Sequence, residues 1–228
     1  MSDPTYQLAA DNVAPERTVA AGREASSSAP GRCVMYALCS DLAASPFDAE
    51  PAVAGTEVDI AGLGLPYKLA GFQEVLDEWR NADREELKRE YSGLFEVGSD
   101  GPPVPIREDL HRNQPAGVRE DIVRFFEFFG YGLEESFAWA PDHLSVELEF
   151  MHFLIYQEAK NVDLENAQSF QFAQHDFSQR HLYDWVPELA ERIRLQRPDS
   201  MYARVIIVLS DFLQLDFHWQ QSTISDQS

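Results

Sequence analysis

The fold of this chain is decided by the stretch APDHLSVELEFMHFLI, which occupies residues 140–155. Pro141 and Asp142 open a predicted helix here, with Asp142 in the role of a preferred N-cap residue. Two sets of apolar side chains then recur at helical spacing. One face comprises Leu144, Leu148, Met151 and Ile155, and the other comprises Val146, Phe150 and Phe153. A helix that is apolar on two faces is usually buried on both sides, so this stretch predicts the centre of a helical bundle.

Apolar residues at helical spacing continue on both sides of this stretch. Asp83 with Glu86 resembles a capping box, and Gly130 fits the C-terminal cap of another helix. No strand is convincing, because the β-prone run Val205–Leu209 lies inside a longer helical stripe from Met201 to Leu215. Further stripes comprise Leu69, Phe72, Leu76 and Trp79; Leu87, Tyr91, Leu94 and Phe95; Val118, Ile122, Phe125, Phe126 and Phe129; and Leu164, Ala167, Phe170, Ala173 and Phe177. The sequence predicts an all-α protein, a single helical bundle of roughly eight to ten helices.

Residues 1–30 differ from the rest of the chain in composition. They are rich in Ala, Ser, Asp, Glu and Pro and show no periodic apolar pattern, which is typical of disordered segments. The remaining length suits one domain with its own core. We therefore expect a disordered tail over residues 1–30 and one helical domain over residues 31–228, with the folded part beginning near Arg32.

The chain is strongly acidic, with a formal net charge of −21. This charge argues against nucleic-acid binding because it repels phosphate. It would attract a basic peptide, although an acidic surface also simply keeps a protein in solution. No basic segment followed by an apolar run opens the chain, and no apolar run is long enough for a membrane span. The spacing of Cys33 and Cys39 matches no zinc or redox motif. These features favour a soluble cytoplasmic protein without stable membrane insertion.

Two Glu-x-x-His pairs are the pattern that points to a metal. Glu108 with His111, and Glu149 with His152, have the spacing used by di-iron helical bundles, which add a Glu from each of two further helices. Acidic residues are abundant in this chain, so chance matches are expected. A helical metal-dependent oxidoreductase is nevertheless the alternative function. The sequence contains no Gly-rich phosphate loop and no nucleophile elbow.

A second cluster of chemically active residues lies at the start of the central stretch. His143 and Glu147 are four residues apart and would share a helix face with Asp142 nearby. Acid–base chemistry is conceivable, because His titrates near neutral pH. The residues themselves favour a structural interpretation, in which Asp142 caps the helix and His143 holds the preceding loop. The aromatic segment around His181 and Trp185 belongs either to the core or to a groove for an apolar peptide face.

Three segments, in this order, resemble the TorD/DmsD/NarJ-type redox-enzyme maturation chaperones. The first is residues 90–95, EYSGLF, followed by the loop 101–105, GPPVP. The second and most specific is residues 140–151, which resembles the Pro-Asp-His motif of the family and the acidic helix behind it. The third is residues 177–187, FSQRHLYDWVP, which resembles a late helix with a His-Leu pair and a nearby Trp.

The resemblance implies a chaperone without a cofactor or metal of its own, and not an enzyme. Such a chaperone would bind the apo catalytic subunit of a molybdopterin oxidoreductase, together with its twin-arginine leader, and hold it for cofactor insertion and assembly before export. The wording of the motifs is most similar to the branch that serves dimethyl sulfide, ethylbenzene, chlorate and selenate enzymes. The residues implied for client contact, or for shaping the site, are Pro141, Asp142, His143 and Glu147, with Tyr91, Phe95, Met151, His181 and Trp185 in a second rank.

The physical chemistry of the chain agrees with this role. An acidic rim can attract the arginine pair of a leader, because carboxylates pair bidentately with guanidinium groups. A groove lined by Phe, Leu and Met can adapt to the apolar part of the leader. We expect a cytoplasmic protein that is a monomer or a domain-swapped dimer, since helical bundles can exchange helices across long loops.

Overall fold

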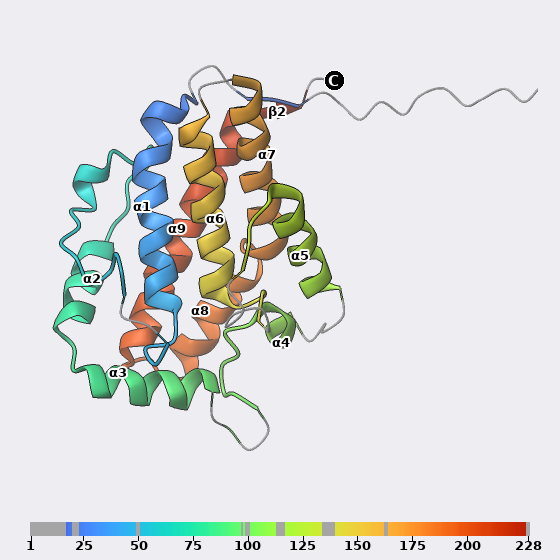
Figure 1. The fold of residues 1–228 in the computed structure, drawn as a ribbon. Coiled ribbons are helices and arrows are strands. Elements are labelled where there is room, and N and C mark those ends of the chain that lie inside the picture. Colours follow the sequence, from blue (N-terminus) through green and yellow to red (C-terminus); the bar gives the residue numbers. More distant parts are fainter. Residues whose placement is uncertain are drawn as a thin grey trace, which may run out of the picture.

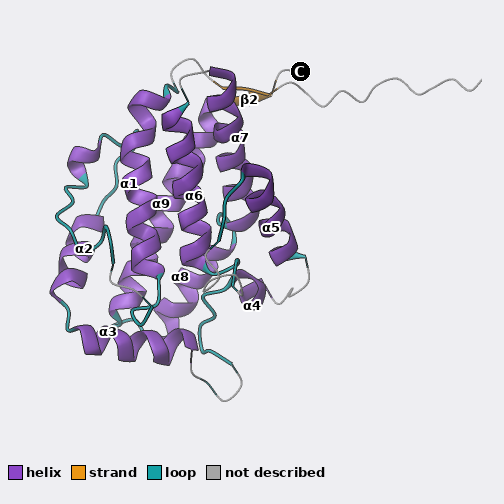
Figure 2. Ribbon diagram, in the orientation of Figure 1, coloured by secondary structure: helices purple, strands orange, loops and turns teal. Residues whose placement is uncertain are grey.

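The structure is a computed structural model that describes residues 17–19, 23–48, 51–96, 98, 101–112, 117–133, 140–161 and 164–226. Helix dominates this part of the chain (Figure 2), which confirms the prediction of an all-α bundle. The helices are α1 (Ala25–Ala43), α2 (Phe72–Asn81), α3 (Arg84–Tyr91), α4 (Glu108–Arg112), α5 (Val118–Phe129), α6 (Leu144–Lys160), α7 (Leu164–His181), α8 (Trp185–Gln196) and α9 (Met201–Thr223). A 3-10 turn η1 (Ala61–Leu63) and a π turn η2 (Ser92–Glu96) lie between helices, while the strand β1 (Arg17–Val19) precedes α1 and the strand β2 (Ile224–Asp226) follows α9. Of these helices, none is both long and apolar enough to cross a membrane.

Helix α6 lies at the centre of the bundle, as its two apolar faces predict. It packs between α1 and α7, while α9 packs against α8, α2 and α1. In Figure 1, α1, α6, α7 and α9 run side by side, and α3 lies across one end. Every side chain of the two predicted faces is buried, apart from the half-buried Phe153. Burying one such side chain stabilises the folded state by about 1.5–3 kcal/mol. Because α6 buries apolar side chains on both faces, it holds the helices on both of its sides in place.

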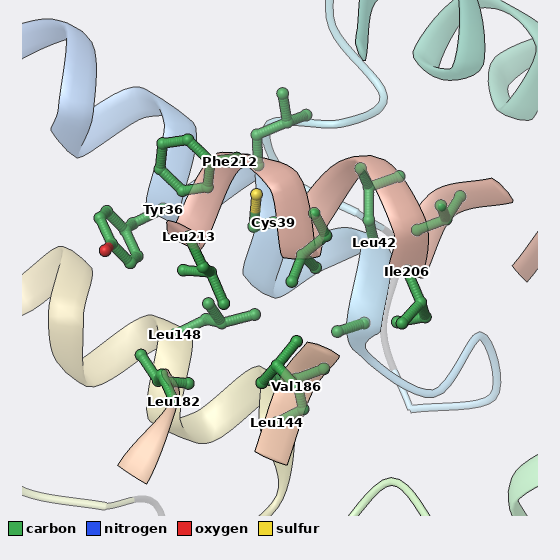
Figure 3. Close-up of a cluster of buried hydrophobic side chains, with 14 of the residues drawn as sticks. Tyr36, Cys39, Leu42, Leu144, Leu148, Leu182, Val186, Ile206, Phe212 and Leu213 are labelled. Atoms are coloured by element: carbon green, nitrogen blue, oxygen red, sulfur yellow. The ribbon is translucent and has the colours of Figure 1, made fainter. Parts of the chain in front are cut away.

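The core joins helices that are far apart in the sequence (Figure 3). Leu144 and Leu148 of α6 point towards Val186 of α8 and Leu213 of α9. All four side chains are buried. Cys39 of α1 is a free thiol that is buried in the same cluster, where it behaves as a small hydrophobe.

Several predicted helix boundaries are confirmed. The carboxylate of Asp83 accepts a hydrogen bond from the backbone N–H of Glu86 at 2.9 Å and so caps α3. Gly130 ends α5 with a φ of 68°, a left-handed conformation that glycine adopts without strain. Pro187 marks no boundary, because it is the third residue of α8, where its missing N–H costs no helical hydrogen bond.

The described secondary structure begins earlier than residue 31, where we expected the folded part to start. Helix α1 begins at Ala25 and continues through Pro30. Gly31 explains why this Ser-, Pro- and Gly-rich segment can be helical and packed. A Cβ atom at residue 31 would lie 2.2 Å from the carbonyl oxygen of Leu63, so only glycine lets η1 approach α1 this closely. Residues 1–16 and 20–22 of the predicted tail lie outside the described residues.

The strands β1 and β2 were not predicted. They form an antiparallel ribbon in which Arg17 pairs with Asp226 and Val19 pairs with Ile224. Each strand has three residues, which is too short for an alternating pattern to show. Their pairing joins opposite ends of the chain, and no local sequence signal reports such a contact.

A buried ion pair ties α1 to α9. The guanidinium group of Arg32 binds the carboxylate of Asp216 through two hydrogen bonds, of 2.6 Å from Nε and 3.0 Å from Nη2. The hydroxyl groups of Tyr36 and Tyr67 each donate to the same carboxylate at 2.8 Å. Burial alone would raise the pKa of Asp216, but Arg32 and the two hydroxyl groups hold it below its usual range. Asp216 is therefore a fully buried carboxylate that stays charged at neutral pH.

The same cluster reaches α6 and α7. Glu158 of α6 lies 3.7 Å from Nη1 of Arg32 and accepts hydrogen bonds from the amides of Gln171 and Gln174 of α7, at 2.7 and 2.8 Å. Trp219 of α9 covers Arg32, with the guanidinium carbon 4.7 Å from the ring centroid. The four long helices of the bundle are thus joined by polar contacts at one end as well as by the apolar core.

Replacing Arg32 by Met should lower the free energy of unfolding by about 3–5 kcal/mol, because it leaves the charge of Asp216 buried without its cation. Adding Asp216→Asn removes that charge, so the double variant should be more stable than Arg32→Met alone. Urea unfolding of both variants and the parent, followed by circular dichroism, measures the effect. A double variant that is less stable than Arg32→Met would show that the hydroxyl groups, and not Arg32, stabilise Asp216.

Candidate functional site

The Pro-Asp-His segment lies where α4 and α6 begin. An isolated antiparallel bridge pairs Arg107 with His143. Next to it, the backbone N–H of Glu108 donates to the carbonyl oxygen of Asp142 at 2.9 Å. This short pairing fixes the start of α4 against the first turn of α6.

Asp142 is fully buried and faces two arginines. Its Oδ1 lies 3.3 Å from Nη2 of Arg107 and 3.1 Å from Nε of Arg119, and its Oδ2 accepts from the backbone N–H of Asp109 at 3.2 Å. Asp142 is therefore not the N-cap of α6, and that prediction was wrong. Two arginines that the fold brings to it from the start of α4 and from α5 compete successfully for its carboxylate, and their approach has no local sequence signal.

His143 is the N-cap residue of α6. Its Nδ1 accepts a hydrogen bond from the backbone N–H of Ser145 at 3.2 Å, and its Nε2 lies 3.1 Å from the hydroxyl oxygen of Tyr91. Because Nδ1 is the acceptor, the neutral ring carries its proton on Nε2 and donates it to Tyr91. Burial lowers the pKa of His143 to about 4, so the ring is neutral at pH 7.

Tyr91 and Phe95 belong to a buried aromatic trio with Tyr202. Their ring centroids lie 4.9 Å apart for Tyr91 and Phe95, 5.4 Å for Tyr91 and Tyr202, and 5.6 Å for Phe95 and Tyr202, with the rings edge to face. Such pairs are worth about 0.5–1.5 kcal/mol beyond the area they bury. Through Tyr91, this trio ties the end of α3 and the start of α9 to the imidazole of His143.

Glu147 is fully buried one turn into α6. Within the described part of the chain, neither of its carboxyl oxygens has a hydrogen-bond partner. Burial, followed by the nearby carboxylates of Glu108 and Asp142, raises the pKa of Glu147 well above its usual range. Its surroundings therefore favour the uncharged form of the carboxyl group, which is buried and not part of the surface.

His181 bridges two carboxylates. Its Nδ1 lies 2.9 Å from Oε2 of Glu108, and its Nε2 lies 3.0 Å from Oδ2 of Asp121. Each carboxylate also binds an arginine, at 2.9 Å between Glu108 Oε1 and Arg112 Nε and at 2.6 Å between Asp121 Oδ2 and Arg180 Nη2. The two carboxylates can stabilise cationic groups. Their contacts with His181 also join α4, α5 and α7.

The remaining predicted residues are buried in the core. The indole N–H of Trp185 donates to the backbone carbonyl of His181, and the ring is buried. The sulfur of Met151 accepts a weak hydrogen bond from the hydroxyl group of Ser178 at 3.7 Å. Pro141 is buried at the junction before Asp142. The structure thus brings the predicted residues together in and around one end of α6, but beneath the surface.

Two adjoining depressions lie along α5 and α7. We call the first the polar cavity; it measures about 540 Å³ and includes Glu108, Arg112, Asp121, Arg180 and His181. We call the second the aromatic groove; it measures about 480 Å³ and includes Phe125, Phe128, Phe129 and Phe172. The two share Asp121, Arg124 and Arg180 as lining residues, so they form one continuous surface.

The sequence did not reveal the exposed part of this surface. Phe128 is 82% exposed and was not among the residues considered, although it falls off the apolar stripe of α5. A large aromatic residue on the polar face of a helix is the signal that could have found it. Asp121, Arg112 and Arg180 carry no such signal, because their meeting depends on the packing of three helices.

The two Glu-x-x-His pairs do not converge on a common site. Glu108 binds His181 and Arg112, whereas Glu149 is exposed and His152 lies with Nδ1 2.9 Å from the carbonyl oxygen of Cys33. Over the residues that the structure describes, no group of three or more His, Cys, Asp and Glu side chains could hold a metal ion. The geometry does not support the metal-dependent oxidoreductase alternative.

Comparison with known proteins places the chain in a family. Residues 63–191, more than half of the chain, match the nitrate reductase delta subunit family. The chain belongs to this family. It is 35% identical to the chlorate reductase assembly chaperone protein of Ideonella dechloratans over 147 residues, which cover 63% of this chain and 73% of that relative. It is 38% identical to the selenate reductase assembly chaperone protein of Thauera selenatis over 136 residues, which cover 57% and 68%.

A chaperone of the TorD type shows the same relationship at lower identity. The chaperone protein TorD of Photobacterium profundum is 28% identical over 172 residues, which cover 69% of this chain and 77% of that relative. These three relatives are named as chaperones and not as catalysts. They confirm the prediction of a TorD/NarJ-type maturation chaperone that is not an enzyme.

The stability of this family member should depend on pH through His143. The unfolded His protonates near pH 6.5, whereas the folded His143 stays neutral down to about pH 4, so protonation favours the unfolded chain between these values. The free energy of unfolding should therefore fall by about 2 kcal/mol from this residue alone between pH 7 and pH 5.

His143→Asn is the matched variant, because Asn also caps helices but does not titrate. Its free energy of unfolding, measured by urea denaturation at both pH values, should fall less than that of the parent by this amount. Other titrating groups, such as Asp109 with its pKa raised by burial to about 6, are present in both proteins and cancel. Equal pH dependence of the two proteins would show that His143 is not held neutral.

Proposed function

We propose that this protein is a system-specific chaperone that binds the apo catalytic subunit of a molybdopterin oxidoreductase. It holds the subunit for cofactor insertion and assembly before export. The names of its relatives as assembly chaperones for chlorate and selenate reductases support a reductase as the partner. The single observation that carries the proposal is the aromatic groove, an apolar surface that is open to a partner protein.

The aromatic groove has the properties of a surface that holds unfinished protein. Phe128 places a whole aromatic ring in solvent, and Phe125, Phe129 and Phe172 continue the apolar lining between α5 and α7. Exposed apolar surface of this kind marks an interaction site. A chaperone that binds only the unfinished client works by mass action, and so it needs no nucleotide.

The residues of the Pro-Asp-His segment support this surface from beneath. Asp142 binds Arg119, which belongs to α5, and Glu147 lies beside Glu108, which lines the polar cavity. We assign to Asp142, His143 and Glu147 the role of shaping the site, since the carboxyl groups of Asp142 and Glu147 are fully buried and the imidazole of His143 is held by Ser145 and Tyr91. The buried aromatic side chains of Tyr91, Phe95 and Trp185 also help to shape the site from the core.

The proposed function also bears on the cellular location and the oligomeric state of the chaperone. A client that is folded before export requires a cytoplasmic chaperone, and a leader bound with the mature subunit would keep the client from leaving too early. The helical domain as a monomer, or as a domain-swapped dimer, would present one groove per chain.

Changing Asp142 and His143 together to Ala should lower the yield of mature client. It should do so by loosening α4 and α5, because the cap of α6 is lost and Arg107 and Arg119 keep Asp109 but lose the second carboxylate that binds both of them. Far-UV circular dichroism and client activity in the host measure the two effects separately. Loss of most of the helical signal would show that these residues hold the whole fold and not the site.

Affinity purification from the native host, followed by mass spectrometry, tests the function directly. A cofactor-free molybdopterin-dependent catalytic subunit should be recovered with the chaperone. Phe128→Ala should reduce this recovery about ten-fold, because it removes the most exposed apolar side chain of the groove.

Leu195→Ala is the matched control. Leu195 is 67% exposed on α8 and does not line the groove, so its loss should leave recovery unchanged. Recovery of no such subunit while the enzyme is being expressed would contradict the proposed function. Equal losses with the two variants would contradict the groove as the binding surface.

A further inference from the structure

The strand β1 begins at the edge of the aromatic groove. Nη1 of Arg17, the first residue of β1, donates to both carboxylate oxygens of Asp176, at 2.8 and 2.9 Å. The guanidinium group of Arg17 also lies over the ring of Phe172, 4.9 Å from its centroid. Asp176 and Phe172 both line the aromatic groove. The residues that precede β1 in the sequence are therefore tethered beside this groove.

Further contacts hold the tether in place. Nη2 of Arg17 lies 3.2 Å from Nδ1 of His175, and β1 packs against α7. The pairing of β1 with β2 fixes the strand from its other side, with Val19 opposite Ile224. Because α7 forms one wall of the groove, these contacts keep the preceding segment close to that wall.

Residues 1–16 have a composition that suits an apolar surface. They contain three acidic residues and no Lys or Arg, and their most apolar stretch is PTYQLAA, residues 4–10. Tyr6 and Leu8 are the large side chains of this stretch. Side chains two positions apart lie on the same side of an extended chain, so Tyr6 and Leu8 can enter one groove together.

The tether is long enough to reach every part of the groove. Leu8 lies nine positions before Arg17, and an extended chain of that length spans about 30 Å. The groove residues of α7 run from Ser169 to Arg180, which is about 17 Å along a helix. The segment therefore needs no rearrangement of β1 to lie along the groove.

The charges around the groove favour an acidic segment. Arg124 and Arg180 line it and Arg17 lies at its edge, whereas only two carboxylates line it, those of Asp121 and Asp176. Arg180 binds Asp121 and Arg17 binds Asp176. Among the described residues, none offers a carboxylate to Arg124 at ion-pair distance. The acidic residues on either side of the apolar stretch can supply that carboxylate.

We propose that residues 4–10 occupy the aromatic groove when no client is present, with Tyr6 and Leu8 against Phe125 and Phe128. The proposal rests on the proposed function, since a client would use the same groove and would have to displace the segment. The segment then covers an apolar surface that would otherwise promote unwanted association between proteins. It also makes client binding a competition within the chain.

Tethering makes even a weak contact effective. A segment on a short flexible tether has an effective concentration of about 1 mM at its site. An intrinsic Kd of about 0.1–1 mM is then enough to fill the groove for half of the time or more. Removal of the contact should therefore tighten the binding of any other groove ligand about two- to ten-fold.

Photochemical cross-linking in the full-length protein tests where the segment lies. The benzophenone amino acid p-benzoylphenylalanine replaces Leu8, and mass spectrometry locates the residues to which it becomes bonded. We expect bonds within one chain to the peptides that carry Phe125, Phe128 or Phe172. Bonds mainly to other faces of the protein would overturn the proposal. Bonds mainly between two chains would also overturn it, because a second copy would then supply the occupant.

Binding of the fluorescent dye anilinonaphthalene sulfonate tests the competition. Tyr6→Ser with Leu8→Ser should lower the Kd of the dye about two- to ten-fold. Val13→Ser with Ala14→Ser is the matched control, because it removes apolar side chains from the same segment outside residues 4–10 and should leave the Kd unchanged. In a Phe128→Ala background the gain should shrink. An unchanged Kd in the first variant, or a gain undiminished by Phe128→Ala, would overturn the proposal.

These outcomes are separable from that of the proposed function. If Leu8 is not cross-linked to the groove while the client subunit is still recovered from the host, the internal occupant is wrong and the chaperone function stands. If the cross-links and the dye binding are as expected but no redox subunit is recovered, the internal occupant stands and the proposed client is wrong.

Discussion

The bundle depends on a single rule, that a charge buried away from water must have a partner. Asp216 is fully buried near the C-terminal end of α9, and Arg32 supplies its counter-charge from α1. The hydroxyl group of Tyr36 in α1, the hydroxyl group of Tyr67 and the carboxylate of Glu158 in α6 complete the cluster. Apolar packing tolerates small shifts between helices, whereas hydrogen bonds to a buried carboxylate do not. The ion pair therefore sets the register in which α1, α6, α7 and α9 pack.

The parts of the fold that were predictable are those in which the cause is local. The two apolar faces of α6, the cap at Asp83 and the glycine that ends α5 are each written within a few residues, and the structure has them. The start of α1 was not predictable, because its Ser, Pro and Gly residues indicate disorder until Leu63 is placed against Gly31. The pairing of β1 with β2 was not predictable for the same reason, since each strand's partner lies at the far end of the chain.

The candidate site shows the same difference between features with a local cause and features with a distant one. The proximity of Asp142, His143 and Glu147 follows from their spacing, but their roles do not. His143 caps the helix, Asp142 binds two arginines, and Glu147 has a raised pKa, because burial and distant charges decide each assignment. The exposed surface was missed since helix periodicity reports what faces the core, and Phe128 faces the solvent. A motif here marks the framework that positions a surface, and the surface itself is built from residues outside the motif.

The ion pair between α1 and α9 also has a consequence for how the protein is made. Asp216 lies 184 positions after Arg32, so α1 emerges from the ribosome long before its counter-charge exists. Until α9 is synthesised, Arg32 has no reason to leave water, and β1 has no strand to pair with. Non-local contacts of this kind close late in folding. The nascent chain therefore exposes the apolar face of α1 through most of its own synthesis, and for that period it resembles the unfinished clients of a chaperone.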